Sequence, residues 1–386
     1  MRKLFALAIL SISTFVYGQK IDTISIQSKV FNENRKVWIY LPYQYFSQPE
    51  KRFEVAYVFD AQAREYFDIV HSTINFVNAG IPLIVVGVVS NYSEEKKENR
   101  NSDFLPKPEN EETTKQYGGY LGKADVFLNY LDNEVIKYID SNYRTFPYRI
   151  GIGHSNGATF LSYCFLEKPE LFNSYVLVSP NYEYDKEQLV KKFESFKPSM
   201  LTSEKFMFMC NSNEGENWIK ARNKVIPLLS SDNYKNKIHF SNKDFSQTEN
   251  HGTVFPLGIF YGLKEFFDYK YLTSENVISY NDELEKKKLL TLNSQQVNDL
   301  AYNCFWKEKT QDAIKIIHWA ILKFPSDPNL YDSQGEFYEK IGDKIGARES
   351  YKSAMEVLQN QKSQFDAKTF EDKLNYYKGN FDRLNK

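Results

Sequence analysis

The sequence has few glycines, few cysteines and no excess of charge of either sign. Glycine accounts for 17 of the 386 residues, well below its usual share of about 7%. Lysine and arginine total 49, and aspartate and glutamate total 50, so the electrostatic footprint of a protein that binds nucleic acid or anionic lipid is absent. The three cysteines lie in apolar segments without paired spacing, which favours buried thiols over a disulfide framework.

Metal-binding signatures are missing as well. The five histidines include no HExxH motif and no close pair, and the cysteines form no CxxC motif. We therefore expect neither a metal nor another cofactor. Hydrophobic residues make up 42% of the chain and aromatic residues 16%, while the mean hydropathy is −0.55. This composition predicts a folded protein without a transmembrane span.

The N-terminal segment has the pattern of a secretory signal. Arg2 and Lys3 precede an apolar run over residues 4–16, and Gly18 supplies a small residue before the expected cleavage near Gln19. The apolar run has thirteen residues, too few to cross a bilayer, which needs about 20. We predict a signal peptide over 1–18 and a periplasmic or secreted protein.

Residues 19–270 alternate between strand and helix patterns. Near-continuous apolar runs, typical of strands covered on both faces, occur at 53–60 and 82–90, and strand-like segments at 149–152, 175–178 and 206–210 continue the series. Helical spacing of apolar residues separates several of these runs. The pattern predicts an α/β fold with a mostly parallel central sheet and helices on both faces, begun by an antiparallel meander.

Beyond residue 271 only helical patterns remain. Ala301, Ala313 and Ala320 are followed 34 residues later by Gly335, Ala347 and Ala354. Small residues at one 34-residue period resemble two tetratricopeptide repeats, in which small side chains let paired helices approach closely. We expect a linker over 271–290 and a small all-α helical-repeat domain over 291–386, suited to protein contact or to packing. An unrelated helical bundle is the alternative.

The glycines gather around one motif. Six of the 17 lie between Gly118 and Gly157, and residues 153–157 read Gly-His-Ser-Asn-Gly, a match to GxSxG. The motif follows a predicted strand and precedes an apolar helix, which is the context of a nucleophile elbow. We predict that Ser155 is a nucleophile at a sharp strand-to-helix turn.

A serine nucleophile needs a base and a group that orients the base. Chain order in this fold class is Ser, then acid, then His, and His251 follows the last predicted strand. The acid is expected in the loop after the strand at 206–210, with Glu214 first and Glu216 second. Gly215 between them permits either, and Glu249 remains a third possibility.

An oxyanion hole needs two N–H donors. The backbone N–H of Asn156, directly after the nucleophile, is one candidate. The other is expected in the loop that follows the strand at 53–60, at Ala61 or Gln62.

With these residues assigned, residues 21 to about 270 resemble the esterase D and enterochelin esterase-like family of α/β-hydrolases. Besides the elbow, the resemblance rests on segments at 35–42, 60–62, 100–106, 143–145, 179–180 and 251–254. It implies an α/β-hydrolase fold and hydrolysis of a carboxylic ester, with Ser155 as nucleophile, His251 as base and an acid near Glu214. Two departures stand out: Ala61 replaces a family glycine, and Asn181 replaces a tryptophan found in many members.

The resemblance implies a small-molecule or oligosaccharide ester as substrate, such as a siderophore lactone or an acylated sugar. Two alternatives stay open from the sequence. One is acyl transfer to an alcohol by the same three residues. The other is a protein-binding module in which the repeats recruit a partner and the hydrolase domain is a relic.

Overall fold

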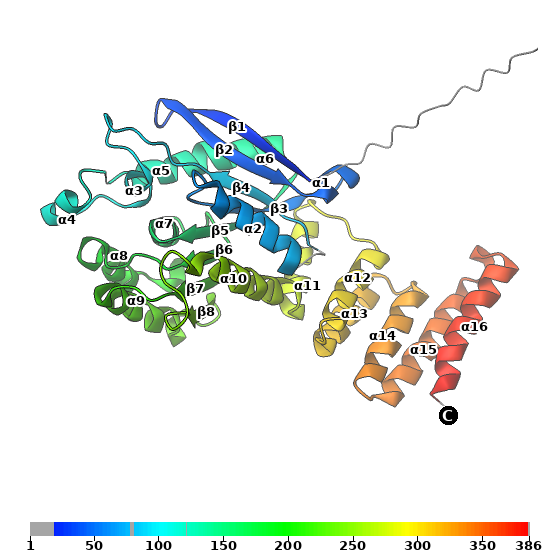
Figure 1. The fold of residues 1–386 in the computed structure, drawn as a ribbon. Helices are drawn as coiled ribbons and strands as arrows, with labels where there is room; N and C mark the ends of the chain where they lie inside the picture. Colours follow the sequence, from blue (N-terminus) through cyan, green and yellow to red (C-terminus); the bar gives the residue numbers. More distant parts are fainter. Residues whose placement is uncertain (1–18, 78–80, 121, 385–386) are drawn as a thin grey trace, which may run out of the picture. The chain divides into compact units, whose positions relative to one another are not determined.

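A computed structural model describes residues 19–77, 81–120 and 122–384 (Figure 1). The predicted signal peptide, 1–18, therefore lies outside the described residues. Contacts between Cα atoms divide the chain into two compact units, one that ends at Leu263 and one that begins at Lys264. None of the described helices combines the length and the apolar composition that crossing a membrane requires.

The first unit is built on one eight-stranded sheet with the order β1-β2-β4-β3-β5-β6-β7-β8. The strands are β1 Lys20–Ser28, β2 Glu33–Leu41, β3 Phe53–Val58, β4 Ile84–Val88, β5 Thr145–His154, β6 Ser174–Val178, β7 Lys205–Asn211 and β8 Ile238–Asp244. β2 pairs antiparallel with β1 and with β4, and the pairs from β4 to β8 are all parallel. The predicted mostly parallel sheet with an antiparallel start is confirmed.

Helices cover both faces of this sheet (Figure 1). The helices that begin in the first unit are α1 Tyr43–Ser47, α2 Arg64–Val77, α3 Arg100–Phe104, α4 Glu111–Gln116, α5 Ala124–Tyr130, a π-helical segment Leu131–Ile136, α6 Lys137–Asn142, α7 Asn156–Glu167, α8 Tyr184–Ser195, α9 Glu216–Leu229 and α10 Val254–Tyr271, the last of which continues past Leu263. Gly258 and Gly262 of α10 lie against side chains of β6 and β7, while α7 packs on the opposite face. The fold is the α/β-hydrolase fold, as predicted.

The second unit contains helices α11 Ser274–Lys286, α12 Ser294–Phe305, α13 Thr310–Lys323, α14 Pro328–Lys340, α15 Lys344–Asn360 and α16 Ala367–Arg383. α14 and α15 each begin 34 residues after α12 and α13, which is the period of the small residues in the sequence. Helix α11 occupies most of the segment expected to be a linker. Val277 and Leu284 are buried and stabilise it, although its composition is mostly polar.

Gly335 sets the distance between α14 and α15. A methyl group added at Gly335 would lie 2.5 Å from the Tyr351 ring, whereas one at Gly379 in α16 would meet no atom within 4 Å. We expect Gly335→Ala to lower the free energy of unfolding by about 1–3 kcal/mol. The control Gly379→Ala should leave it unchanged or raise it by up to about 1 kcal/mol. Urea unfolding followed by circular dichroism measures both, and equal values for the two variants would contradict the packing argument.

Candidate active site

Ser155 lies at the turn between the end of β5 and the start of α7. Its backbone has φ 56° and ψ −123°, a conformation that residues with a side chain rarely adopt. A methyl group on Gly153 would lie 2.5 Å from the backbone of Gly157, so the turn requires glycine there. The strained turn places Ser155 at the N-terminus of α7, where the helix dipole favours developing negative charge.

His251 and Glu214 meet at the carboxyl end of the sheet. The His251 Nδ1 atom lies 3.2 Å from Glu214 Oε1, and the Glu214 side chain is only 3% exposed. Glu216, the second candidate acid, is 80% exposed and pairs with Lys220 instead. Within the part of the chain that the structure describes, neither Glu216 nor Glu249 contacts the His251 side chain. Ser155 Oγ makes no hydrogen bond to His251 there.

The surroundings of Glu214 favour its charged form. Burial raises the pKa of this carboxyl, whereas hydrogen bonds from His251, Ser179 and Ser212 lower it. The hydrogen bonds together outweigh burial, so the pKa of Glu214 lies below its usual value. The bond from Ser212 Oγ is 2.7 Å long. Glu214 is therefore a carboxylate at neutral pH and can accept the N–H of a histidine ring.

His154, the second residue of the GxSxG motif, connects the nucleophile strand to the His251 loop. Its Nε2 atom lies 2.9 Å from the backbone oxygen of His251, and its Nδ1 atom lies 3.2 Å from the Tyr66 hydroxyl. A carbonyl oxygen only accepts, so Nε2 carries the proton and Nδ1 accepts from Tyr66. The sequence indicated His154 only as part of the elbow.

Burial and the nearby His251 lower the pKa of His154 to about 4, so this ring is neutral in the folded protein. In the unfolded chain it takes up a proton below about pH 6.5. Stability is therefore lost as the pH falls from about 6.5 towards 4. We expect His154 to contribute about 2 kcal/mol of this loss between pH 6.5 and 4.5. Urea unfolding of wild type and of His154→Gln, which keeps a donor but does not titrate, measures it; equal pH slopes would contradict the assignment.

The candidate oxyanion donors differ in availability. The Ala61 N–H donates to Val88 O at 3.3 Å, and the Ala61 oxygen accepts from Trp38 Nε1 at 3.2 Å. The Ala61 N–H thus already has an acceptor at the end of β4, which favours Gln62 over Ala61 as the second donor. No acceptor is recorded within the described chain for the N–H of Gln62 or of Asn156, so these two donors are free.

Alanine in place of the family glycine at position 61 is accommodated by a neighbouring strand. A methyl group added at Gly87 of β4 would lie 2.9 Å from the Ala61 Cβ atom. Gly87 therefore leaves the space that the Ala61 side chain fills. The Gln62 side chain is fixed by its own bonds, donating to Asp60 Oδ1 at 2.9 Å and accepting from Ser90 N at 3.2 Å.

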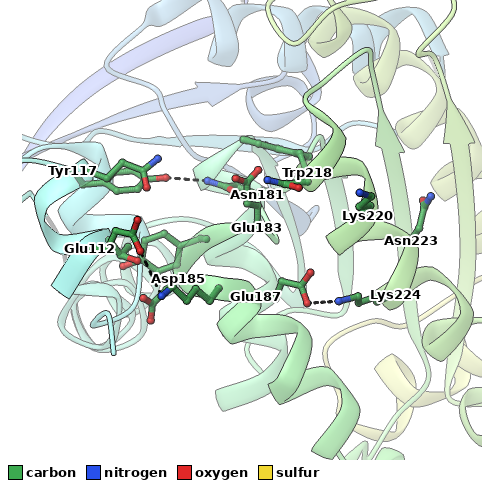
Figure 2. Close-up of a pocket in the computed structure, with 15 residues that line it drawn as sticks. Glu112, Tyr117, Asn181, Glu183, Asp185, Glu187, Trp218, Lys220, Asn223 and Lys224 are labelled. Carbon is green, nitrogen blue, oxygen red and sulfur yellow. Dashed lines mark hydrogen bonds and ion pairs between the residues drawn. The ribbon is translucent and has the colours of Figure 1, made fainter. Parts of the chain in front are cut away.

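Asparagine and aromatic side chains form a wall next to the nucleophile. Asn156 donates to Asn101 Oδ1 at 2.9 Å and accepts from Asn181 Nδ2 at 3.1 Å. Asn181 also lies 3.2 Å from the Tyr117 hydroxyl, as the dashed line in Figure 2 marks. The Trp218 ring stands edge to face on His251, with ring centroids 5.0 Å apart. Of these wall residues, the sequence pointed only to Asn156 and to Asn181, the latter as a departure from the family.

Comparisons with known proteins show which family and which fold this chain resembles. Residues 28–246, more than half of the chain, match the model of a family described as "Putative esterase". The ferri-bacillibactin esterase BesA of Bacillus subtilis is 25% identical over 180 residues, covering 43% of this chain. The match spans 60% of that relative's length, less than two thirds.

Two solved structures show the same fold. An IroE-like serine hydrolase from Shewanella oneidensis superposes with a TM-score of 0.57 at 19% identity, covering 79% of this chain and 100% of its own. An uncharacterised protein from Capnocytophaga ochracea superposes with a TM-score of 0.55 at 16% identity, covering 93% of this chain and 100% of its own. At these identities the likeness concerns the fold alone.

Proposed function

The chain belongs to the "Putative esterase" family, and on that premise we propose that it hydrolyses a carboxylic ester through an acyl-enzyme formed on Ser155. The observation that carries the proposal is the buried His251–Glu214 pair, with 3.2 Å between Nδ1 and Oε1, in the same unit as the strained Ser155 turn. Strain of this kind is retained at functional sites, where the surrounding structure holds it in place.

In the proposed mechanism, Ser155 Oγ attacks the ester carbonyl while His251 Nε2 takes the serine proton. Glu214 holds His251 with its proton on Nδ1, so that Nε2 is free to accept, and it stabilises the imidazolium that forms. The N–H groups of Asn156 and Gln62 bind the developing oxyanion. His251 then returns the proton to the leaving alcohol, and water, activated in the same way, releases the acid from Ser155.

The substrate in this proposal is a siderophore lactone or an acylated sugar. The similarity to a ferri-bacillibactin esterase supports the first class, and the amides and aromatic rings near Asn156 support the second. We propose in addition that residues 1–18 direct the protein to the periplasm or outside the cell. The 34-residue spacing of the helices supports tetratricopeptide-like hairpins in the second unit, with a role in protein contact.

An organophosphate fluoride tests the nucleophile. Diisopropyl fluorophosphate should add one diisopropylphosphoryl group per chain, on Ser155, and hydrolysis of 4-nitrophenyl acetate should fall in proportion to the label. Urea-unfolded protein is the control, because the reactivity depends on the folded turn, and it should take up no label. Labelling at another residue, or full labelling with activity retained, would contradict the proposal.

A further inference from the structure

A cavity of about 1010 Å³ adjoins the candidate active site, between the α4 region, the start of α8 and the start of α9 (Figure 2). Two of its lining residues touch the site itself. Trp218 contacts the His251 ring, and Asn181 donates to the Asn156 side chain. The cavity therefore opens beside the His251 ring and the Asn156 side chain.

Aromatic rings and amides make up much of the cavity lining. The rings are Tyr117, Tyr184 and Trp218, and the amides are Gln116, Asn181, Asn217 and Asn223. Aromatic faces pack on the C–H surfaces of a sugar ring, while amides donate to and accept from hydroxyl groups. This chemistry suits a polyhydroxylated group.

The charges of the lining give it a net charge of minus one, with four carboxylates against three ammonium groups. Each lysine already has a carboxylate partner: Lys186 lies 3.4 Å from Glu112, Lys224 lies 2.5 Å from Glu187, and Lys220 lies 2.6 Å from Glu216. No lysine of the lining is left unpaired to compensate an anionic ligand.

Glu183 is the carboxylate of the lining without a recorded side-chain partner in the described chain. Asp185, two residues on, accepts from the backbone N–H of Glu109 at 2.7 Å and of Asn110 at 3.2 Å. Asp185 begins a left-handed turn, with φ 50° there and 53° at Lys186. These bonds hold the turn and so fix the segment that carries Glu183 at the cavity.

We propose that Glu183 makes the cavity selective for esters whose cavity-bound group carries hydroxyls and no negative charge. The inference rests on the proposed esterase function and deepens it. Two unit charges 4 Å apart interact by about 1 kcal/mol in water and by about 4 kcal/mol at a protein surface. An anionic group beside Glu183 is repelled, and a multiply anionic iron chelate is repelled more strongly than a neutral sugar ester.

Three matched esters test the selectivity: methyl glucoside acetylated at O2, and its analogues with a carboxylate or an ammonium group at C6. We expect kcat/KM for the carboxylate to be about tenfold below that for the neutral ester, and kcat/KM for the ammonium ester to equal or exceed the neutral value. Glu183→Gln should reduce the carboxylate penalty to about twofold, and Glu183→Lys should reverse the order. Glu194→Gln, at the other end of α8 and outside the lining, is the control and should change nothing.

Hydrolysis of 4-nitrophenyl acetate, which is too small to fill the cavity, tests the proposed esterase function separately from the selectivity of the cavity. If this ester is not hydrolysed, the proposed function fails. If it is hydrolysed and the three sugar esters are not, or the carboxylate is cleaved as fast as the neutral ester, the inference is overturned and the function stands. Faster cleavage of a ferric tris-catecholate trilactone than of the neutral sugar ester would also overturn it.

Discussion

Ser155→Ala is expected to reduce kcat for 4-nitrophenyl acetate by roughly 10⁴- to 10⁶-fold, the range seen when a serine nucleophile is removed. The alanine has no oxygen that can form the acyl-enzyme, while the N–H donors of Asn156 and Gln62 are unchanged. Binding of the ester should therefore persist, with little change in the dissociation constant. Stopped-flow kinetics and equilibrium binding of a non-hydrolysed amide analogue measure the two quantities.

Ser155→Gly is a second variant whose loss of activity cannot be attributed to unfolding. Glycine adopts φ 56° without the steric cost that a side chain brings, so this variant should gain about 1 kcal/mol in the free energy of unfolding. It should lose activity as completely as Ser155→Ala does. Retention of more than a hundredth of the wild-type kcat in either folded variant would exclude Ser155 as the nucleophile.

Local patterns predicted the elbow and the sheet because both depend on short-range physics. The buried strands β3, β4, β6 and β7 are near-continuous apolar runs, since both faces are covered. The Ser155 turn is visible because Gly153 and Gly157 must approach each other closely. Helix α11 was not foreseen because its sequence is mostly polar, and the burial of Val277 and Leu284 depends on tertiary packing.

The availability of the oxyanion donors depends on strand register, which the sequence does not reveal. Ala61 and Gln62 are neighbours, and either N–H could face the nucleophile. The Ala61 N–H is occupied and the Gln62 N–H is not, because Val88 at the end of β4 accepts the Ala61 N–H just after β3 ends. The cavity was missed for a similar reason, since Tyr117, Glu183 and Trp218 come from three distant segments that carry no common motif.

The acid proposed to orient His251 is the clearest case in which the sequence left several candidates, with Glu214 and Glu216 ahead of Glu249. Glu214 and Glu216 flank Gly215, and a turn there could present either. In the fold, Glu216 begins α9 and is 80% exposed, while Glu214 is 3% exposed and 3.2 Å from His251 Nδ1. Burial and the nearby serines make Glu214 the carboxylate that can fix the histidine tautomer.

Glu214→Gln should therefore lower kcat by roughly 10³- to 10⁴-fold with little change in KM, as replacement of a triad acid by its amide does. The amide donates to Nδ1, which shifts the His251 proton to Nε2 and leaves no acceptor for the Ser155 proton. Glu216→Gln and Glu249→Gln are the matched controls, and each should stay within twofold of wild type. Steady-state kinetics at pH 7 measures all three variants, and urea unfolding checks that the Glu214 variant is folded. The assignment is wrong if Glu214→Gln stays active while Glu216→Gln or Glu249→Gln loses activity by roughly 10³-fold or more. In that case the glutamate replaced in the inactive variant orients His251.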